Sequence, residues 1–309
     1  MWFVFAAASA LCFGLRGILY QWTSQRPIDR NLLLFGVYLS GTLIVLGANG
    51  FAGQAWTQAA WIGVLLGLFS FMGNASMYKG YAVGRASLVA LLTAMPPVVV
   101  VAAAFFLWNE KLNTAQLASF LVIIAGLLLI RYSSDISFRN LKGVQWGALA
   151  MLSFGLTDLT TKQATLLGAE TLPVLSMMFA TGSLLFGASW LAGRAKPSPA
   201  RVTARETAAA EDSTDSGAAA AASPAPVPWS AGRTVVWGMV VGLTNVCGMM
   251  FVMPAFREGV TGLVSAIIAM NVVFVLLYAR FVLKETFSRR ETAGLVCTVA
   301  GVILLRLAA

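Results

Sequence analysis

Of the 12 acidic residues in this sequence, Asp158 alone lies in the middle of a long apolar segment. A charged side chain at the depth of lipid hydrocarbon costs free energy, so such a residue is expected to have a function. Ser153, Thr157 and Thr161 share a helical stripe with Asp158, and Lys162 follows it by one turn. Two interpretations follow: Asp158 and Lys162 take part in proton coupling, or they form a static ion pair that neutralises itself.

Arg16 is another ionisable side chain within an apolar segment, one helical turn before Tyr20. A guanidinium group binds anions well because it presents its N–H donors in a fixed planar fork. Arg16 and Tyr20 are therefore candidate binding residues for a solute with an anionic group. The alternative is that the Arg16 side chain extends along its helix to the lipid headgroups and binds no solute.

A stripe of polar and aromatic residues runs along one face of the segment 60–82, at intervals of four, four and three residues. Such a stripe suits a solute-binding cavity, although hydrogen bonding between helices without a ligand would produce the same pattern. The candidate binding residues are Ser70, Asn74, Tyr78 and Tyr81, together with Thr157 and with Asn245, which matches Ser70 in the internal repeat described below.

Pro96 and Pro97 lie near the middle of the apolar segment 86–108, where proline removes backbone donors and kinks a helix. At the matching depth of segment 260–283 the chain carries Asn271. Interrupted helices at matching positions of two halves are typical of binding sites in transporters. Pro96 and Pro97 are therefore a predicted hinge, and Asn271 is a further candidate binding residue.

Several other kinds of chemistry lack the residues they need. The sequence contains no histidine, which excludes imidazole relays and histidine-ligated metals. Cys12, Cys247 and Cys297 lie in apolar segments without CxxC spacing and are interpreted as buried thiols. HExxH, a second mid-segment aspartate and GxxxxGK[ST] are all missing, which argues against proteases and nucleotide hydrolases. We expect no enzymatic activity, no catalytic residue, no metal and no cofactor.

The elements that position these side chains are long apolar segments. Of the 309 residues, 59% are hydrophobic and 11% are charged, whereas about a quarter of the residues in soluble domains are charged. A segment of roughly 20 apolar residues crosses about 30 Å of hydrocarbon as a helix. The sequence thus predicts an all-α membrane protein with ten transmembrane helices, near residues 2–22, 32–48, 60–82, 86–108, 114–131, 143–165, 171–192, 234–256, 260–283 and 289–307.

An internal repeat divides the chain. Shifted by 175 residues, segment 63–131 aligns with 238–306 without a gap, and 19 of the 69 aligned residues are identical, more than shared apolar composition explains. The sequence therefore predicts two five-helix repeats, residues 1–142 and 143–309, with a disordered linker at 195–232. Because five is odd, the second repeat is inverted relative to the first. The matches include Gly63-xxx-Gly67 with Gly238-xxx-Gly242, which we expect to pack helices within the monomer, Glu110 with Glu285, and Arg131 with Arg306.

One unit occurs twice, as WNEKLNTAQLASFLVIIAGLLLIR and LKETFSRRETAGLVCTVAGVILLR, and each copy places a glutamate before a capped helix. With the repeated glycines, this unit resembles the EamA-type drug/metabolite transporter superfamily over essentially the whole chain apart from the linker. The resemblance implies a ten-helix transporter for small organic solutes, with helices 114–131 and 289–307 outside a central cavity. It implies no particular substrate, because members move amino acids, sugars, nucleotide sugars, choline and drugs.

The basic residues are distributed unevenly between the two sides of the predicted membrane. The loops of one side hold 16 lysines and arginines, and those of the other side hold four. Because cytoplasmic loops carry the excess of positive charge, the sequence predicts a multi-pass plasma-membrane protein with both termini outside and the linker 195–232 in the cytoplasm. The family resemblance implies the opposite orientation.

A secondary transporter would account for inverted repeats, polar stripes and a deep carboxylate together. We expect the repeats to rock around a midplane site by alternating access, driven by a proton or solute gradient. Set against Asp158, the basic residues Arg16, Lys79, Lys162 and Arg257 favour an anionic solute, although Lys79 and Arg257 lie near segment ends, where they would otherwise anchor the helices at the interface. An unpaired Asp158 facing the cavity would favour a cationic or neutral solute. A multidrug efflux protein and a non-transporting sensor or scaffold are the alternatives. The expected partners are a small-molecule solute and membrane lipids, without nucleic acid, in a monomer or homodimer.

Overall fold

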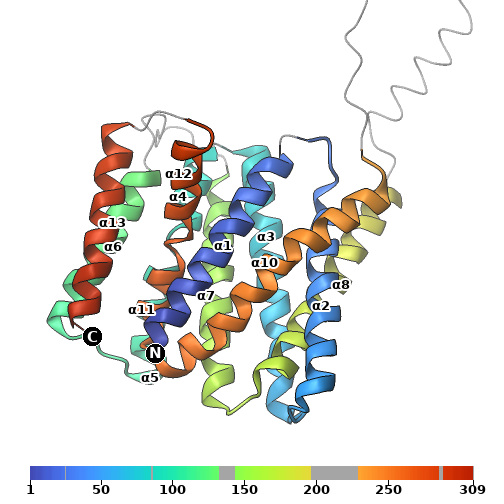
Figure 1. Cartoon of the computed structure of the whole chain (residues 1–309), viewed down its shortest axis with the longest axis horizontal. Coiled ribbons are helices and arrows are strands. Elements are labelled where there is room, and N and C mark those ends of the chain that lie inside the picture. The colour runs from blue at the N-terminus through green and yellow to red at the C-terminus, as the bar shows by residue number, and fades with distance from the viewer. Residues whose placement is uncertain (25, 85, 132–142, 196–228, 285–287, 309) are drawn as a thin grey trace, which may run out of the picture.

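The computed structural model describes the chain except for residues 25, 85, 132–142, 196–228, 285–287 and 309, and the described residues form helices with short connections (Figure 1). Every segment predicted to be helical contains at least one helix, and α6 begins and ends where predicted. The segments 86–108 and 260–283 are each divided into two helices. Most of the predicted linker lies outside the described residues. The helices are α1 (Trp2–Ser24), α2 (Arg30–Ala52), η1 (Gln58–Trp61), α3 (Ile62–Val83), α4 (Ala86–Thr93), α5 (Pro96–Trp108), α6 (Thr114–Arg131), α7 (Val144–Leu166), α8 (Thr171–Ala195), α10 (Ala231–Glu258), α11 (Thr261–Ile268), α12 (Asn271–Phe281) and α13 (Arg289–Ala308).

Eight helical stretches of the described chain are long and apolar enough to cross a membrane, where ten were predicted. They are α1, α2, η1 with α3, α4 with α5, α6, α8, α10, and α11 with α12. The two other predicted spans are the 23-residue α7, which carries Asp158 and Lys162, and the 20-residue α13, which begins with three charged residues. Both pack lengthwise against an apolar span, α7 against α3 and α13 against α6. The chain is therefore a multi-pass membrane protein.

Reciprocal side-chain hydrogen bonds begin the two helices that follow the repeated glutamates. The backbone N–H of Asn113 donates to Gln116 Oε1 at 3.1 Å, and the backbone N–H of Gln116 donates to Asn113 Oδ1 at 2.8 Å. Ser288 and Glu291 exchange the same pair of bonds before α13. Both helices are thus capped as predicted, each by a capping box, a motif that depends only on residues three positions apart.

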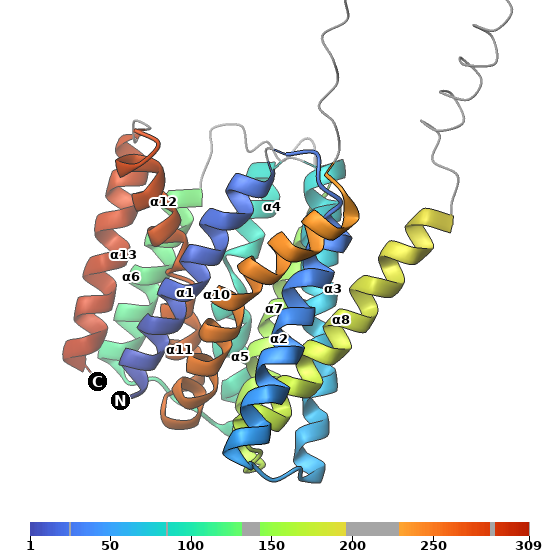
Figure 2. The ribbon, with the colours of Figure 1, turned by 45° about the vertical axis from the view of Figure 1, so that its right-hand side comes forward.

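The helices of the two halves of the sequence interleave. In the first half, α2 packs against α8 and α10 of the second half, and α3 packs against α7 and α8. The first helix, α1, lies against α10, α11 and α12. Helices α6 and α13 lie side by side at one edge of the molecule (Figures 1 and 2), which agrees with the outer position implied for 114–131 and 289–307.

The first helix of each predicted repeat runs in the opposite direction to the other. Helix α1 starts where the amino group of Met1 lies 3.5 Å from a carboxylate oxygen of Glu258. Helix α7 finishes in the same region, because Lys162 Nζ donates to the carbonyl oxygen of Gly259 at 3.1 Å. We call this the terminal end, since both chain termini lie there, whereas α8 finishes and α10 begins at the opposite end (Figure 1).

The two GxxxG motifs pack helices within the monomer, as predicted. Gly67 of α3 lies so close to α8 that an added Cβ would be 2.5 Å from the carbonyl oxygen of Met178. Gly63 also faces the α8 backbone, and Gly238 and Gly242 of α10 face α2 in the same way. Only a residue without a side chain permits these backbone approaches, so the motifs position α3 and α10.

The three cysteines are free, but the prediction that they are buried is wrong. Cys12 and Cys297 are half-buried within the molecule, and Cys247 is exposed. Cys12 and Cys247 lie in α1 and α10, which are apolar enough to cross a membrane, and a thiol on the outer surface of such a helix meets lipid, so an apolar neighbourhood does not require burial by other protein residues.

Candidate functional site

A cavity of about 290 Å³ lies between the two halves of the chain. Its walls come from α1, α3, α6, α7, α8, α10 and α11 and from the breaks between α4 and α5 and between α11 and α12. A volume at the lower end of the range for ligand pockets suits a small solute. The predicted site residues that line it are Arg16, Tyr20, Ser70, Asn74, Tyr81, Pro96, Pro97, Thr157, Asp158, Asn245 and Asn271.

The two helix breaks lie at matching positions of the repeat. Helix α4 ends at Thr93, and α5 begins with Pro96, which has no N–H to continue the bonding of the preceding helix. In the second half, α11 ends at Ile268 and α12 begins with Asn271. Thr93, Pro96, Ile268 and Asn271 all line the cavity. The interruption predicted from the prolines is confirmed, and the second half has its own interruption without a proline.

Arg16 points into the cavity from α1. One of its Nη atoms donates a hydrogen bond to Oδ1 of Asn245 in α10, so the side chain joins the two halves. Its guanidinium carbon lies 4.5 Å from the ring centroid of Phe13 and 5.9 Å from that of Tyr20, within the range of cation–π attraction. The interpretation in which Arg16 extends to the lipid headgroups is therefore wrong.

Asp158 lines the same cavity from α7. Its Oδ2 accepts a hydrogen bond from the hydroxyl of Ser265 in α11, and within the described part of the chain it has no ion pair. Thr157 and Thr161 beside it donate their hydroxyl protons to carbonyls of α7 itself, at 3.0 and 2.8 Å. The carboxyl group of Asp158 is thus held by one neutral partner and faces the cavity.

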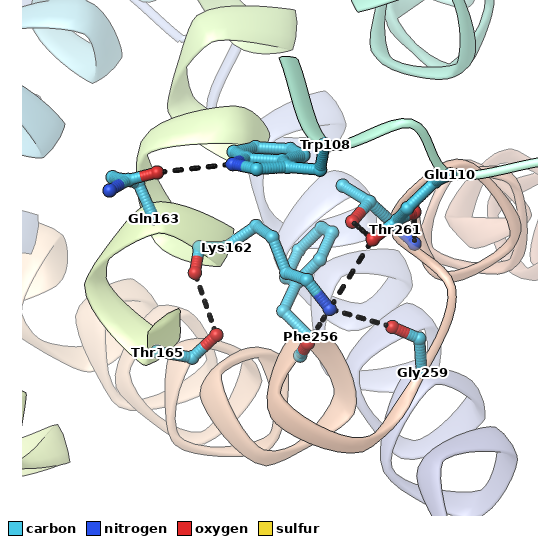
Figure 3. Close-up of polar contacts among 8 residues, drawn as sticks. All are labelled: Trp108, Glu110, Lys162, Gln163, Thr165, Phe256, Gly259 and Thr261. Carbon is cyan, nitrogen blue, oxygen red and sulfur yellow. Dashed lines mark hydrogen bonds and ion pairs between the residues drawn. The ribbon is translucent and has the colours of Figure 1, made fainter. Parts of the chain in front are cut away.

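Lys162 does not pair with Asp158, contrary to the static-pair interpretation, and does not line the cavity. Its Nζ lies 3.5 Å from Oε1 of Glu110, which follows α5. The ammonium group also donates to the carbonyl oxygens of Phe256, at 3.0 Å, and Gly259, at 3.1 Å (Figure 3). The side chains of Lys162 and Glu110 are 10% and 20% exposed, so water screens this pair weakly.

Glu110 also holds the start of α11. Its Oε2 accepts from the backbone N–H of Thr261, and its Oε1 accepts from the Thr261 hydroxyl, both at 2.8 Å (Figure 3). A carboxylate is favourable there because the first N–H groups of a helix have no partner within the helix. We call Glu110, Lys162 and Thr261 the clasp, since it joins the first half of the chain to two helices of the second. The repeat partner Glu285 lies outside the described residues.

Tyr78 is the other predicted site residue that does not line the cavity. Its ring lies 5.3 Å from the guanidinium carbon of Arg30, beside the hydrophobic core. Tyr38, which the sequence did not single out, instead shares a hydrogen bond with Ser70. At 3.6 residues per turn, Tyr78 lies at one edge of the stripe, so it faces a different neighbour from Ser70, Asn74 and Tyr81.

Of the four basic residues expected to favour an anionic solute, only Arg16 lines the cavity. Lys162 belongs to the clasp, and Lys79 Nζ lies 3.9 Å from the ring centroid of Trp146. Arg257 Nη2 donates to a backbone carbonyl between α7 and α8 at 3.1 Å. The charge of the cavity must therefore be counted again from the residues that line it.

Several residues that line the cavity were not predicted as site residues, among them the polar Arg131 and Ser265. Arg131, the last residue of α6, counted in the sequence only as a loop-side positive charge and as the repeat match of Arg306. Ser265 lies in the short helix α11, and its repeat partner is Ala90, so the repeat carried no signal for it. A polar residue in an otherwise apolar segment was the only available indication for Ser265.

Comparison with known protein families explains this layout. Residues 1–132 and 141–307 match the model of the EamA-like transporter family, which is nearly the whole chain. This chain belongs to the EamA-like transporter family. Its fold is similar to that of a solved structure described as "Crystal structure of protein", with a TM-score of 0.74, 16% identity and coverage of 100% of this chain and 99% of that chain. At this identity the likeness concerns the fold alone. No curated protein matches the chain.

Membership in the EamA-like family agrees with the position and size of the cavity. The family consists of membrane transporters of small molecules, and its model matches this chain as two successive stretches. In this EamA-like chain, Arg16 belongs to the first stretch and Asp158 to the second, and both line the cavity. The cavity thus lies between the two matched stretches.

Proposed function

We propose that this EamA-like protein is a secondary transporter that moves a small organic solute with an anionic group by alternating access. An unpaired Asp158 by itself would favour a cationic or neutral solute, but Arg16 and Arg131 line the same cavity and leave its described lining with a net positive charge. The observation that carries the proposal is the cavity between the two halves, bounded by both helix breaks and holding Arg16 and Asp158. Ionisable side chains cost free energy at membrane depth, and a scaffold without a solute has no need of them. Broken helices at matching positions are typical of transporter sites.

Alternating access requires a closure that can open at each end of the cavity. Thr161 lines the cavity and Lys162 follows it directly, so the clasp lies at the terminal end of the solute space. We infer that this conformation is closed at the terminal end, and that the two inverted repeats separate there when the clasp breaks. Because an ion pair with aligned hydrogen bonds is either made or broken, it suits a switch between two states.

Asp158 is the proposed proton-coupling group. It is the one carboxyl group among the described cavity-lining residues, and its bond to Ser265 joins α7 to α11. Protonation would change both the charge of the solute space and the hydrogen bond between these helices. Lys162 acts through the clasp in this proposal and not through Asp158.

The proposed orientation follows the positive charges, with the termini outside and the linker in the cytoplasm. The termini lie at one end of the structure, and α8 ends and α10 begins at the other (Figure 2), which either orientation requires; the distribution of positive charge is what favours this one. In that arrangement the clasp closes the outer end of the cavity, and this conformation is the one in which the cavity is accessible from the cytoplasm.

Metabolite profiling of cells and medium tests the proposal. Cells that express the wild type are compared with cells that express Asp158→Asn at matched levels and with a vector control. Glu258→Gln is the matched control, because that carboxylate pairs with the amino terminus outside the cavity. We expect at least one anionic metabolite to shift with the wild type and Glu258→Gln but not with Asp158→Asn. No difference in any metabolite would replace the proposal with drug efflux or a non-transporting sensor.

A further inference from the structure

Arg131 brings a second guanidinium group to the cavity. It is the last residue of α6, which otherwise packs with α13 at the edge of the molecule. The side chain lines the same cavity as Arg16, and its Nε is buried without a hydrogen-bond partner among the described residues. A buried N–H without a hydrogen-bond partner costs free energy, more so when it belongs to a permanently charged group. A bound ligand with an acceptor oxygen would remove that cost.

The repeat partner of Arg131 shows that helix position alone does not explain this burial. Arg306 occupies the same place near the end of α13, yet it is exposed and lies over the ring of Phe3 at 5.6 Å. A positive charge needed only to orient a helix in the membrane would be satisfied at the surface, as Arg306 is. Of the two equivalent arginines, only Arg131 lines the solute space.

The charges that line the cavity are unbalanced. Among the described lining residues, Arg16 and Arg131 are basic and Asp158 is the acidic residue. Asp158 is bonded to Ser265 and Arg16 to Asn245, both neutral, so no described ion pair neutralises either guanidinium. A guanidinium group recognises carboxylate and phosphate oxygens with several N–H donors at once.

We propose that Arg131 is a second anion-binding residue and that the solute is a small dianion, a dicarboxylate or a phosphate ester, held between Arg16 and Arg131. This deepens the proposed function and rests on it. A zwitterion such as an amino acid would leave one guanidinium without an anionic partner. The cavity volume of about 290 Å³ limits the solute to a small metabolite.

Thermal unfolding of the purified full chain in detergent, followed by tryptophan fluorescence, tests this inference. The probes are succinate and glycerol 3-phosphate as dianions, lactate as a monoanion, glycine as a zwitterion and choline as a cation. We expect at least one dianion to stabilise the wild type at lower concentration than the other three probes, because only a dianion engages both guanidinium groups. Whether succinate or glycerol 3-phosphate stabilises the protein at lower concentration then distinguishes a dicarboxylate site from a phosphate-ester site.

The variants Arg131→Gln and Arg306→Gln form a matched pair at equivalent helix positions. In Arg131→Gln the affinity for the dianion should fall about tenfold or more while the affinity for lactate changes little, since one charge-assisted contact is lost. Arg306→Gln should bind as the wild type does. Without probe, Arg131→Gln should unfold no earlier than the wild type, because a buried N–H without a partner has been removed; a structural arginine would give the reverse.

Three results would overturn the inference: no dianion stabilises the wild type, glycine or lactate binds as well as either dianion, or Arg131→Gln keeps the dianion preference. If Arg131→Gln does not fold, Arg131→Lys replaces it and should weaken the preference while keeping the charge. Binding of glycine or lactate that depends on Arg16 would contradict the proposal that the solute is a dianion, but it would not contradict the proposed transport function. Metabolite profiling decides the transport function separately.

Discussion

Replacing Lys162 by methionine should open the terminal end of the cavity. Methionine keeps most of the side-chain volume and removes the ammonium group. The carbonyl oxygens of Phe256 and Gly259 then lose donors at 3.0 and 3.1 Å, and Glu110 loses its ion-pair partner at 3.5 Å. Both acceptors lie at the end of α10 and in the loop after it. The loss of the two hydrogen bonds therefore weakens the junction of α7, α10 and α11.

The size of the effect follows from the burial of the pair. Removing one partner of a buried ion pair costs about 3–5 kcal/mol. Glu110 keeps both hydrogen bonds from Thr261 and its side chain is 20% exposed, which places this case at the lower limit, about 3 kcal/mol. At about 1.4 kcal/mol per factor of ten, the closed state loses about 100-fold in population relative to an open state without the clasp.

Two measurements check this prediction, and Lys111→Met is the control because Lys111 is exposed beside the clasp. In the first, unfolding of Lys162→Met in detergent should show the loss of stability, and Lys111→Met should match the wild type. In the second, Ala164→Cys, a buried position in α7, is introduced after Cys12, Cys247 and Cys297 have been replaced. An impermeant thiol reagent should label it faster in the Lys162→Met background.

A double-mutant cycle with Glu110→Gln assigns the effect to the pair. Each single variant should destabilise the protein, and the double variant should be less destabilised than the sum, because the second change no longer leaves an unpaired buried charge. The reasoning is refuted if Lys162→Met unfolds as the wild type does and Ala164→Cys is labelled at the same rate in both backgrounds.

Three further predictions follow from the same structure. Asp158→Asn should abolish uphill, gradient-driven accumulation without lowering expression, and full retention of uphill transport would remove the proton-coupling role. Gly67→Ala should destabilise the protein by about 1–3 kcal/mol in thermal unfolding, since its Cβ would lie 2.5 Å from the Met178 carbonyl oxygen, whereas Gly47→Ala, with open space around it, should be neutral or stabilising. A cysteine placed in the linker 195–232 should be protected from an impermeant thiol reagent in intact cells, and labelling there would reverse the proposed orientation.

Helices and their ends depend on neighbours along the chain, which is why they were predicted well. The box Asn113–Gln116 places the start of α6, and the proline pair at Pro96 and Pro97 places the break between α4 and α5. The internal repeat then predicted further residues of the site. Asn271 at the second break was found from its alignment with Pro96, and it does line the cavity. Asn245 was found in the same way from Ser70.

What only the tertiary structure decided is which side chains meet. Spacing on α7 made Asp158 the obvious partner of Lys162, but the ammonium group lies against Glu110, whose position in space depends on how α5 and α11 pack. Arg131 and Arg306 are equivalent in the repeat, yet Arg131 at the end of α6 lines the cavity, whereas Arg306 in α13 is exposed at the surface. The sequence by itself determined a duplicated, membrane-spanning helical protein with ionisable groups at depth, because apolar length, caps and repetition are properties of the chain. Contacts between distant residues are set by helix rotation and packing, so the partners of those ionisable groups emerged only with the fold.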